Sequence, residues 1–211
     1  MILLKEDLFG RVTRDGDVVI RDAGAARWWL RPLARQLAHR ESRALARLQA
    51  QAGIPRLRAA ADNGVLRRSW IDGSPMQQAR PQSALYFRHA MQLTRALHRV
   101  GVVHNDLAKE PNWLVTDAGE PALVDFQLSL IRDRPRGRIW RALAYDDIRH
   151  LLKHKRSYCP SSLSAREHRI LARPSWPARL WKSTGKPLYR FVTRRLLGWS
   201  DREGAGDRNH S

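Results

Sequence analysis

A short polar segment between two apolar runs constrains this chain more than any other part of its sequence. Residues 101–115, GVVHNDLAKEPNWLV, place Asp106, Lys109 and Asn112 in a predicted loop. The apolar residues 113–115 and 122–125 lie on either side of a turn and predict a hairpin directly after this loop. Asp125 ends the second strand, so the hairpin returns a carboxylate toward the loop.

Carboxylates and an amide that converge on one point need a cation to neutralise them. Their oxygen ligands suit Mg²⁺, which proteins hold with one or two carboxylates while phosphates complete the coordination. Lys109 lies in the same loop and could neutralise a phosphate. A base, metal ligands and a positive charge are the parts that phosphoryl transfer requires, so the segment predicts this chemistry.

The first 50 residues predict strands followed by a helix. Residues 2–5 are apolar, and residues 11–14 and 18–21 flank Asp15-Gly16, a strong hairpin signal. Leucines at helical spacing follow Pro32, and they are Leu33, Leu37, Leu45 and Leu48. Glu41 lies on the same side of this helix. Its carboxylate either meets a buried cation or reaches solvent from the edge of the apolar stripe, and the helix alone favours neither.

The rest of the chain adds one strand and two helices. Residues 65–71 predict a strand that the sequence DGSP interrupts at 72–75. A long helix is expected from about Ser83 to Arg99, where Gly101 stops it, and another from Tyr145 to Lys155. With 211 residues and 43% hydrophobic content, the chain can bury a core. No apolar run is long enough to cross a bilayer, and the single Cys159 suits a reducing compartment, so a cytoplasmic protein is expected.

The sequences HNDLAKEPN and LVDFQ resemble the catalytic loop and the metal-binding strand of the protein-kinase-like superfamily. The resemblance implies that Asp106 is the catalytic base, that Asn112 and Asp125 hold Mg²⁺, and that Lys109 approaches the γ-phosphate of ATP. It also implies that His104 packs the loop.

Upstream motifs extend the resemblance. The sequence VVIR at 18–21 occupies the place of V-A-I-K, so Arg21 stands for the phosphate-binding lysine and Glu41 for its helix partner. The sequence SWIDG at 69–73 resembles the hinge, with backbone near Trp70 meeting adenine and Asp72 near the ribose. Small members are the most similar, namely the bacterial lipopolysaccharide-core (Kdo and heptose) kinases and the RIO serine/threonine kinases.

The implied fold is α+β, a compact two-lobed protein-kinase-like fold. It has a small β-rich N-lobe with one long helix (1–72), a mainly helical C-lobe with the catalytic loop (73–173), and a basic, Trp-rich extension (174–211). The implied activity is transfer of the γ-phosphate of ATP, with Mg²⁺, to a hydroxyl of a protein Ser/Thr or a lipopolysaccharide sugar. About twenty residues between Asp125 and Tyr145 leave little platform for a peptide, which favours a glycan, lipid or other small acceptor.

Four departures from the family pattern leave a second function open. Asn112 lies six residues after Asp106, where the pattern has five. Arginine replaces lysine at position 21, no G-x-G-x-x-G is present, and Gln127 stands where the pattern has glycine. The alternative is a nucleotide-binding pseudokinase that docks on a membrane or a partner.

The formal net charge of +19 attracts polyanions. The tail mixes Trp176, Trp181 and Trp199 with Arg and Lys, which suits either an amphipathic helix on the inner face of an anionic membrane or the completion of the C-lobe core. Trp28-Trp29 could add a second membrane contact. Nucleic acid is less favoured, since no recognition motif accompanies the charge.

Two further groups of side chains lie on the predicted helix 145–155. One of Asp146 and Asp147 is expected to cap that helix, and the resemblance implies that one of them braces the catalytic loop. His150 and His154 are four residues apart but have no third ligand at a convincing spacing, so hydrogen-bonded or solvated histidines are expected rather than a metal site.

Overall fold

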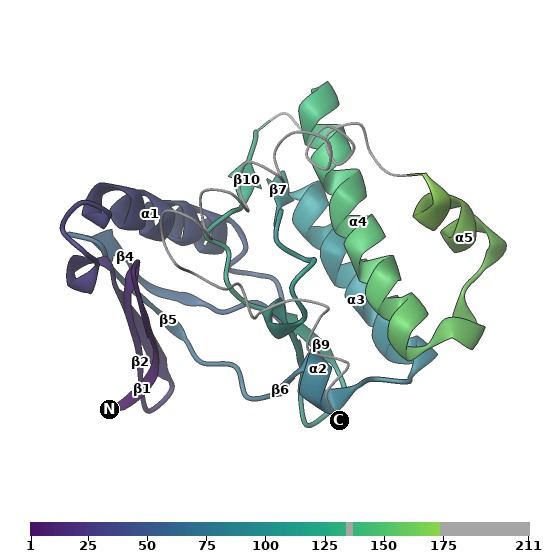
Figure 1. Ribbon diagram of the computed structural model, residues 1–211, viewed down its shortest axis with the longest axis horizontal. Coiled ribbons are helices and arrows are strands. Elements are labelled where there is room, and N and C mark those ends of the chain that lie inside the picture. The colour runs from purple at the N-terminus through teal and green to yellow at the C-terminus, as the bar shows by residue number, and fades with distance from the viewer. Residues whose placement is uncertain (134–136, 174–211) are drawn as a thin grey trace, which may run out of the picture.

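Five antiparallel strands form the N-terminal part of the protein, in the order β1-β2-β3-β5-β4. The computed structural model describes residues 1–133 and 137–173 (Figure 1). The strands are β1 (Ile2–Asp7), β2 (Gly10–Asp15), β3 (Val18–Asp22), β4 (Leu57–Asp62) and β5 (Val65–Ser69). The predicted strand at 2–5 therefore extends two residues further, and the hairpin around Asp15-Gly16 is present as predicted.

The turn between β1 and β2 is short and anchored. Asp7 pairs with Gly10, so only two residues, Leu8 and Phe9, connect the strands. Gly10 has a φ of 124°, and a Cβ there would collide with the carbonyl of Asp22. Phe9 packs against a small cluster of buried alanines, Ala23, Ala26 and Ala34. The sheet therefore ends in a fixed tight turn at the place where the family pattern has a glycine-rich loop.

The helix α1 (Arg31–Arg47) contacts β4 and β5 of this sheet and begins with Pro32 in its first turn. Its buried face matches the predicted leucine stripe only in part: Leu45 and, just beyond the helix, Leu48 are buried, but Leu33 is 44% exposed. The other buried positions are Ala34, Ala38, Glu41, Ser42 and Ala44. Leucine spacing was misleading at the start of the helix, because small alanines let it approach the sheet closely. Glu41 is completely buried, so the buried alternative for this carboxylate holds.

The second part of the protein is mainly helical. Two long helices, α3 (Ala84–Arg99) and α4 (Arg138–Tyr158), contact each other, and α5 (Ala165–Ala172) contacts α4 (Figure 1). The short elements are α2 (Met76–Ala79), β6 (Ser74–Pro75), β7 (Val102–Val103), β8 (Trp113–Val115), β9 (Pro121–Leu123) and β10 (Leu130–Ile131), with 3-10 turns at Ala23–Ala25, Glu110–Asn112 and Pro160–Ser162. One apolar core joins the two parts, since Leu45 of α1 and Leu48 directly after it cluster with Trp113, Phe126 and residues of α3.

The predicted helices are present, with changed bounds. Ser83 caps α3 with its side chain, and Gly101 follows that helix with a φ of 79°. The last predicted helix was too short at both ends, since α4 spans 21 residues. The predicted strand ending in Asp125 was too long, because β9 stops at Leu123.

The predicted extension 174–211, with its proposed amphipathic helix, lies outside the described residues. Within residues 1–133 and 137–173, no helix combines the length and the apolar character that crossing a membrane requires.

Candidate active site

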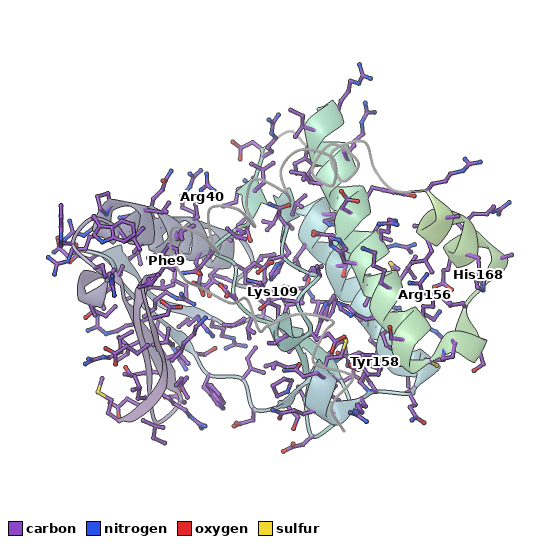
Figure 2. All side chains as sticks on the ribbon, in the orientation of Figure 1. Phe9, Arg40, Lys109, Arg156, Tyr158 and His168 are labelled. Carbon is purple, nitrogen blue, oxygen red and sulfur yellow. The ribbon has the colours of Figure 1, made fainter. Side chains whose placement is uncertain are left out.

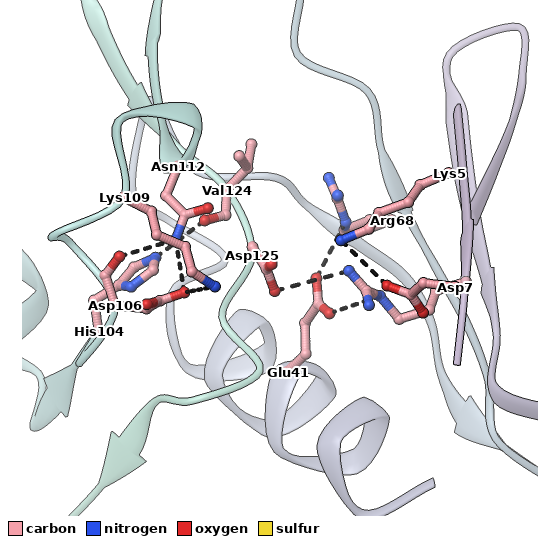
Figure 3. A network of polar contacts seen from close by, with 11 residues as sticks. Lys5, Asp7, Glu41, Arg68, His104, Asp106, Lys109, Asn112, Val124 and Asp125 are labelled. Carbon is pink, nitrogen blue, oxygen red and sulfur yellow. Dashed lines mark hydrogen bonds and ion pairs between the residues drawn. The ribbon is translucent and has the colours of Figure 1, made fainter. Parts of the chain in front are cut away.

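The loop between β7 and β8 brings its three predicted site residues into direct contact (Figure 3). Asp106 Oδ2 lies 3.1 Å from Lys109 Nζ and accepts a hydrogen bond of 3.0 Å from Asn112 Nδ2. Asn112 Nδ2 also donates to the backbone carbonyl of Asp106, at 2.9 Å. Both hydrogen bonds use the amide nitrogen and neither uses Asn112 Oδ1.

A buried carboxylate on α4 fixes the start of this loop. The backbone N–H groups of His104 and Asn105 donate to the two carboxylate oxygens of Asp147, at 2.8 and 2.9 Å. His98 Nε2 of α3 lies 3.1 Å from the same carboxylate. His104 is itself fully buried, contacts the carbonyl of Val124 through Nε2 and packs on the ring of Phe126. Asp147, rather than Asp146, is therefore the residue of this pair that braces the loop.

The extra residue in the loop is also held by α4. The segment Glu110–Asn112 forms a single 3-10 turn. Glu110 Oε2 accepts a hydrogen bond of 2.7 Å from the hydroxyl of Tyr158, and His154 Nε2 lies 2.8 Å from the carbonyl of Leu107. These contacts tie the longer loop to the last turns of α4.

Asp125 lies beyond the end of β9 and faces the sheet. Its φ of 65° is in the left-handed region, which Asp tolerates better than most residues and which turns the chain out of the strand. Burial alone would raise the pKa of this carboxyl, but Arg21, His104 and Lys109 outweigh it, so the pKa of Asp125 is lowered. Asp125 is therefore a carboxylate that stays charged in a site rich in cations.

Two arginines of the sheet share the carboxylate of Glu41 (Figure 3). Arg21 Nε and Arg68 Nε each lie 3.2 Å from one of its oxygens, and Arg21 Nη2 lies 3.7 Å from Asp125 Oδ1. Burial lowers the pKa of Arg68. Burial opposes the charge of Arg21 too, but Glu41, Asp125 and Asp7 together raise its pKa. These ion pairs lack hydrogen-bond alignment, because both Nε atoms and both Glu41 oxygens have no hydrogen-bond partner.

The side chains around the loop fit a divalent cation with oxygen ligands. Asp125 Oδ1 is buried without a hydrogen-bond partner, and Asn112 Oδ1 is available nearby in the loop. Mg²⁺ prefers carboxylate and amide oxygens of this kind as ligands. Among the described residues, no group of three His, Cys, Asp or Glu side chains forms a different metal centre. His154 Nε2 lies 2.8 Å from the carbonyl of Leu107, and burial lowers the pKa of His150 to about 4.

Comparison with known protein families shows which family this chain belongs to. The model of the RIO domain matches residues 9–171, which is most of the chain. The chain belongs to the RIO domain family. This confirms the RIO-type side of the predicted resemblance.

The match extends from the tight β1–β2 turn to α5 and includes all eight predicted site residues of this RIO domain.

Solved structures agree on the fold. The crystal structure of the Rio2 kinase from Chaetomium thermophilum is similar, with a TM-score of 0.54, 18% identity, and coverage of 71% of this chain and 54% of that chain. A second structure, the Rio2 kinase-ADP/Mg2+-phosphoaspartate complex from the same organism, has a TM-score of 0.48 and 17% identity over 72% of this chain and 57% of that one. This RIO domain spans about half the length of those chains, and the predicted α+β protein-kinase-like fold is confirmed. No curated protein matches the chain.

The segment after β5 carries Trp70 and Asp72, the predicted hinge residues. Trp70 Nε1 donates a hydrogen bond of 2.6 Å to Asp72 Oδ1, and the guanidinium of Arg14 lies 4.2 Å from the centre of the Trp70 ring. The backbone N–H of Trp70 donates to the carbonyl of Asp17 and so continues the sheet. An adenine contact at this hinge must therefore use groups other than that N–H.

Sequence reasoning missed two residues that shape the site of this RIO domain. Arg68 is a second partner of Glu41, and Glu110 links the loop to α4. Arg68 carried a signal, since VLRRSWI predicts a strand in which either Arg67 or Arg68 must face inward. Glu110 carried none, because its partner Tyr158 is 48 residues away in the chain.

Proposed function

We propose that this RIO domain is an ATP- and Mg²⁺-dependent phosphotransferase that moves the γ-phosphate to a hydroxyl group. The contact geometry around Asp106 carries the proposal, because one carboxylate oxygen lies between Lys109 Nζ and Asn112 Nδ2. A carboxylate held in this way can orient an acceptor hydroxyl and take its proton. Lys109 lies beside it, where its charge can stabilise the transferred phosphoryl group.

The metal and nucleotide roles follow from the same arrangement. Asn112 Oδ1 and Asp125 would hold Mg²⁺, which would bridge the phosphates and neutralise their charge. Arg21, fixed by Glu41, would face the α- and β-phosphates, and residues 70–72 would border the adenine and ribose. In this proposal, residues 1–72 form the N-lobe that covers the nucleotide, and residues 73–173 form the C-lobe that carries the catalytic loop.

A small acceptor fits this site better than a long peptide. The segment between Asp125 and α4 is short, and its strand β10 is tied to β7 beside the catalytic loop. Little chain is then left to present an extended substrate. We therefore favour a lipopolysaccharide-core sugar or a similar glycan over a protein Ser/Thr, in the cytoplasm or at the inner face of the membrane.

One contact favours the alternative of a nucleotide-binding pseudokinase. Arg21 Nη2 lies 3.7 Å from Asp125 Oδ1, so the residue that replaces lysine neutralises the predicted metal ligand. If this contact persists when nucleotide binds, Asp125 is less able to hold Mg²⁺. The protein would then bind nucleotide without transferring phosphate.

A phosphate-transfer assay separates the two functions. The purified full chain is incubated with radiolabelled ATP and Mg²⁺, together with crude lipopolysaccharide, a generic Ser/Thr protein, or no acceptor. Asp106→Asn should reduce transfer by about a thousandfold while nucleotide binding persists, because it removes the base and keeps the shape. Equal transfer by wild type and Asp106→Asn would contradict the enzyme proposal, and nucleotide binding with no transfer by either would favour the pseudokinase.

A membrane contact is a separate part of the proposal, and the start of α1 supports it. Trp28 and Trp29 are 78% and 45% exposed, which is unusual for such large rings. The exposed face of α1 carries Arg31, Arg35, Arg40 and Arg43, of which Figure 2 labels Arg40. The single acidic residue of that helix is the buried Glu41. Exposed tryptophans beside arginines suit an anionic lipid surface.

Vesicle co-sedimentation tests this contact on the full chain. Trp28→Ser/Trp29→Ser should lower binding to vesicles rich in phosphatidylglycerol, with no binding to phosphatidylcholine in either case. Leu85→Ser, at another exposed apolar position, is the matched control. Binding that is unchanged in the double variant would remove the α1 surface from the proposal.

A further inference from the structure

We propose that Lys5, on β1, supplies a mobile ammonium that contacts the nucleotide phosphates beside Arg21, whose guanidinium is held in place by two carboxylates. The inference rests on the proposed function and names a phosphate-binding residue for the same site. Lys5 is the only lysine before Lys109 in the sequence. The family pattern gives it no role, because the pattern places its lysine on the third strand.

The register of the sheet puts Lys5 on the same face as Arg21. Lys5 pairs with Val12 across β1 and β2, and Val12 pairs with Arg21 across β2 and β3. Side chains of directly paired residues project from the same face of a sheet. Arg21 contacts Glu41 and Asp125. The row of paired residues Lys5, Val12 and Arg21 therefore faces the candidate site.

The side chains next to Lys5 on β1 lie alternately on the site face and on the outer face of the sheet. Asp7, two residues along the strand, lies on the same face, and Lys5 Nζ is 3.2 Å from its Oδ2 (Figure 3). The charge of Asp7 also helps to raise the pKa of Arg21, which places the Lys5–Asp7 pair close to the site. Glu6 and Arg11 occupy the alternate positions and form their own ion pair of 3.1 Å on the outer face.

Arg21 can face the phosphates but cannot follow them as they move, because two carboxylates already hold its guanidinium. Its Nε lies 3.2 Å from Glu41 and its Nη2 lies 3.7 Å from Asp125, and its side chain is only 16% exposed. Moving this guanidinium would leave the buried Glu41 with Arg68 alone. Arg21 is thus better suited to fixing Glu41 and Asp125 than to following a substrate.

Lys5 has the freedom that Arg21 lacks. Its side chain is 55% exposed, and among the described residues it forms an ion pair with Asp7. That carboxylate has a second contact, since Asp7 Oδ1 accepts a hydrogen bond from the N–H of Phe9 in the turn. The ammonium is a point charge on a flexible stem, so it can leave Asp7 for a more highly charged phosphate while Asp7 stays bound to the turn. The anchored turn keeps β1 in place during this exchange.

Nucleotide titrations of the full chain test the role. Dissociation constants are measured by calorimetry for ATP with Mg²⁺, for ADP with Mg²⁺ and for adenosine, using wild type, Lys5→Met, Lys5→Arg and Arg11→Met. Lys5→Met should weaken both phosphate ligands by at least about tenfold, since a hydrogen bond to a charged group contributes this much. Adenosine binding should not change, and Lys5→Arg should recover part of the loss.

The controls separate a phosphate contact from general damage to the sheet. Arg11→Met removes a cation from the outer face of the same two strands and should bind all three ligands as wild type does. Asp7→Asn removes the competing carboxylate and should tighten binding of ATP or leave it unchanged. A Lys5→Met variant that binds ATP like wild type, or that loses adenosine and ATP equally, overturns the proposal.

Failure of this inference differs from failure of the proposed function. If wild type binds ATP and transfers phosphate while Lys5→Met does both equally well, only the role of Lys5 is wrong. If wild type binds neither ATP nor ADP, the proposed function is wrong and the role of Lys5 falls with it.

Discussion

The two halves of the site are held by different kinds of interaction. On the catalytic-loop side, Asp147 accepts hydrogen bonds from two consecutive backbone N–H groups, and Asn112 donates two to Asp106. On the sheet side, Glu41 lies between the guanidinium groups of Arg21 and Arg68 at 3.2 Å each, without hydrogen-bond alignment. The loop is therefore fixed by directional contacts, and the sheet side by charge.

This difference indicates which half of the site can rearrange when a ligand binds. Hydrogen bonds weaken steeply when their angle changes, so the loop favours one geometry. Ion pairs fall off slowly with distance and tolerate rearrangement, so the sheet side can respond when a highly charged ligand enters. A base needs a fixed position relative to its acceptor, whereas a nucleotide site must accept and release a charged ligand, and the two halves divide these requirements.

Glu41→Gln should have the largest effect on stability. It leaves two buried guanidinium groups without their common counter-charge, and breaking a buried ion pair from one side costs about 3–5 kcal/mol. We expect the free energy of unfolding, measured by urea denaturation, to fall by this amount. Glu6→Gln breaks an exposed ion pair on the outer face of the sheet and should change it by less than about 1 kcal/mol.

A second substitution sharpens the test. Arg68→Leu in the Glu41→Gln background removes one of the two uncompensated charges and should recover part of the lost stability. Equal costs for Glu41→Gln and Glu6→Gln would show that charge does not hold the sheet side, and the comparison between the two halves would fail.

Asp147→Asn should have a smaller effect on stability, concentrated on the loop. The amide keeps one acceptor oxygen but cannot accept from both His104 and Asn105, so one buried N–H loses its partner at a cost of about 2 kcal/mol. Hydrogen exchange of these two amides should become faster. Asp146→Asn, at the neighbouring position, should leave the exchange of these amides unchanged. Unchanged exchange in Asp147→Asn would contradict the conclusion that hydrogen bonds to Asp147 fix the loop.

The sequence was sufficient for the parts of the site that local patterns encode. The polar loop, Asp125 and the Asp15-Gly16 hairpin follow from spacing and apolar periodicity within a few residues. The same periodicity placed Glu41 on the apolar side of its helix but left its burial open, and the structure buries it completely. The strand expected to end in Asp125 was too long because the left-handed conformation at Asp125 turns the chain, and spacing cannot show a φ angle.

Long-range contacts were the part that the sequence could not supply. The tie between Glu110 and Tyr158 joins a loop to a helix end, and neither residue type indicates it. The buried face of α1 was predicted only in part: Leu45 is buried as expected, but Leu33 is exposed, and alanines at 34, 38 and 44 pack on the sheet instead. Packing between elements, not local preference, decided that face.

Acid should weaken the helical half of the protein before the sheet half. Burial and nearby Lys153 lower the pKa of His150 on α4 from 6.5 to about 4, so between these values the unfolded chain binds more protons than the folded one. The contribution of His150 is therefore complete above pH 6.5 and is lost as the pH falls toward 4, at most about 2 kcal/mol by pH 5. Asp125 has a pKa below its ordinary 3.8, so its contribution persists throughout this range. Urea denaturation from pH 7 to 4.5 should show a smaller loss of stability for His150→Gln than for wild type. Over the same range, hydrogen exchange should become faster in α4 before it does in β3 and β5. Equal losses of stability in the two proteins would contradict the role of His150 in acid sensitivity.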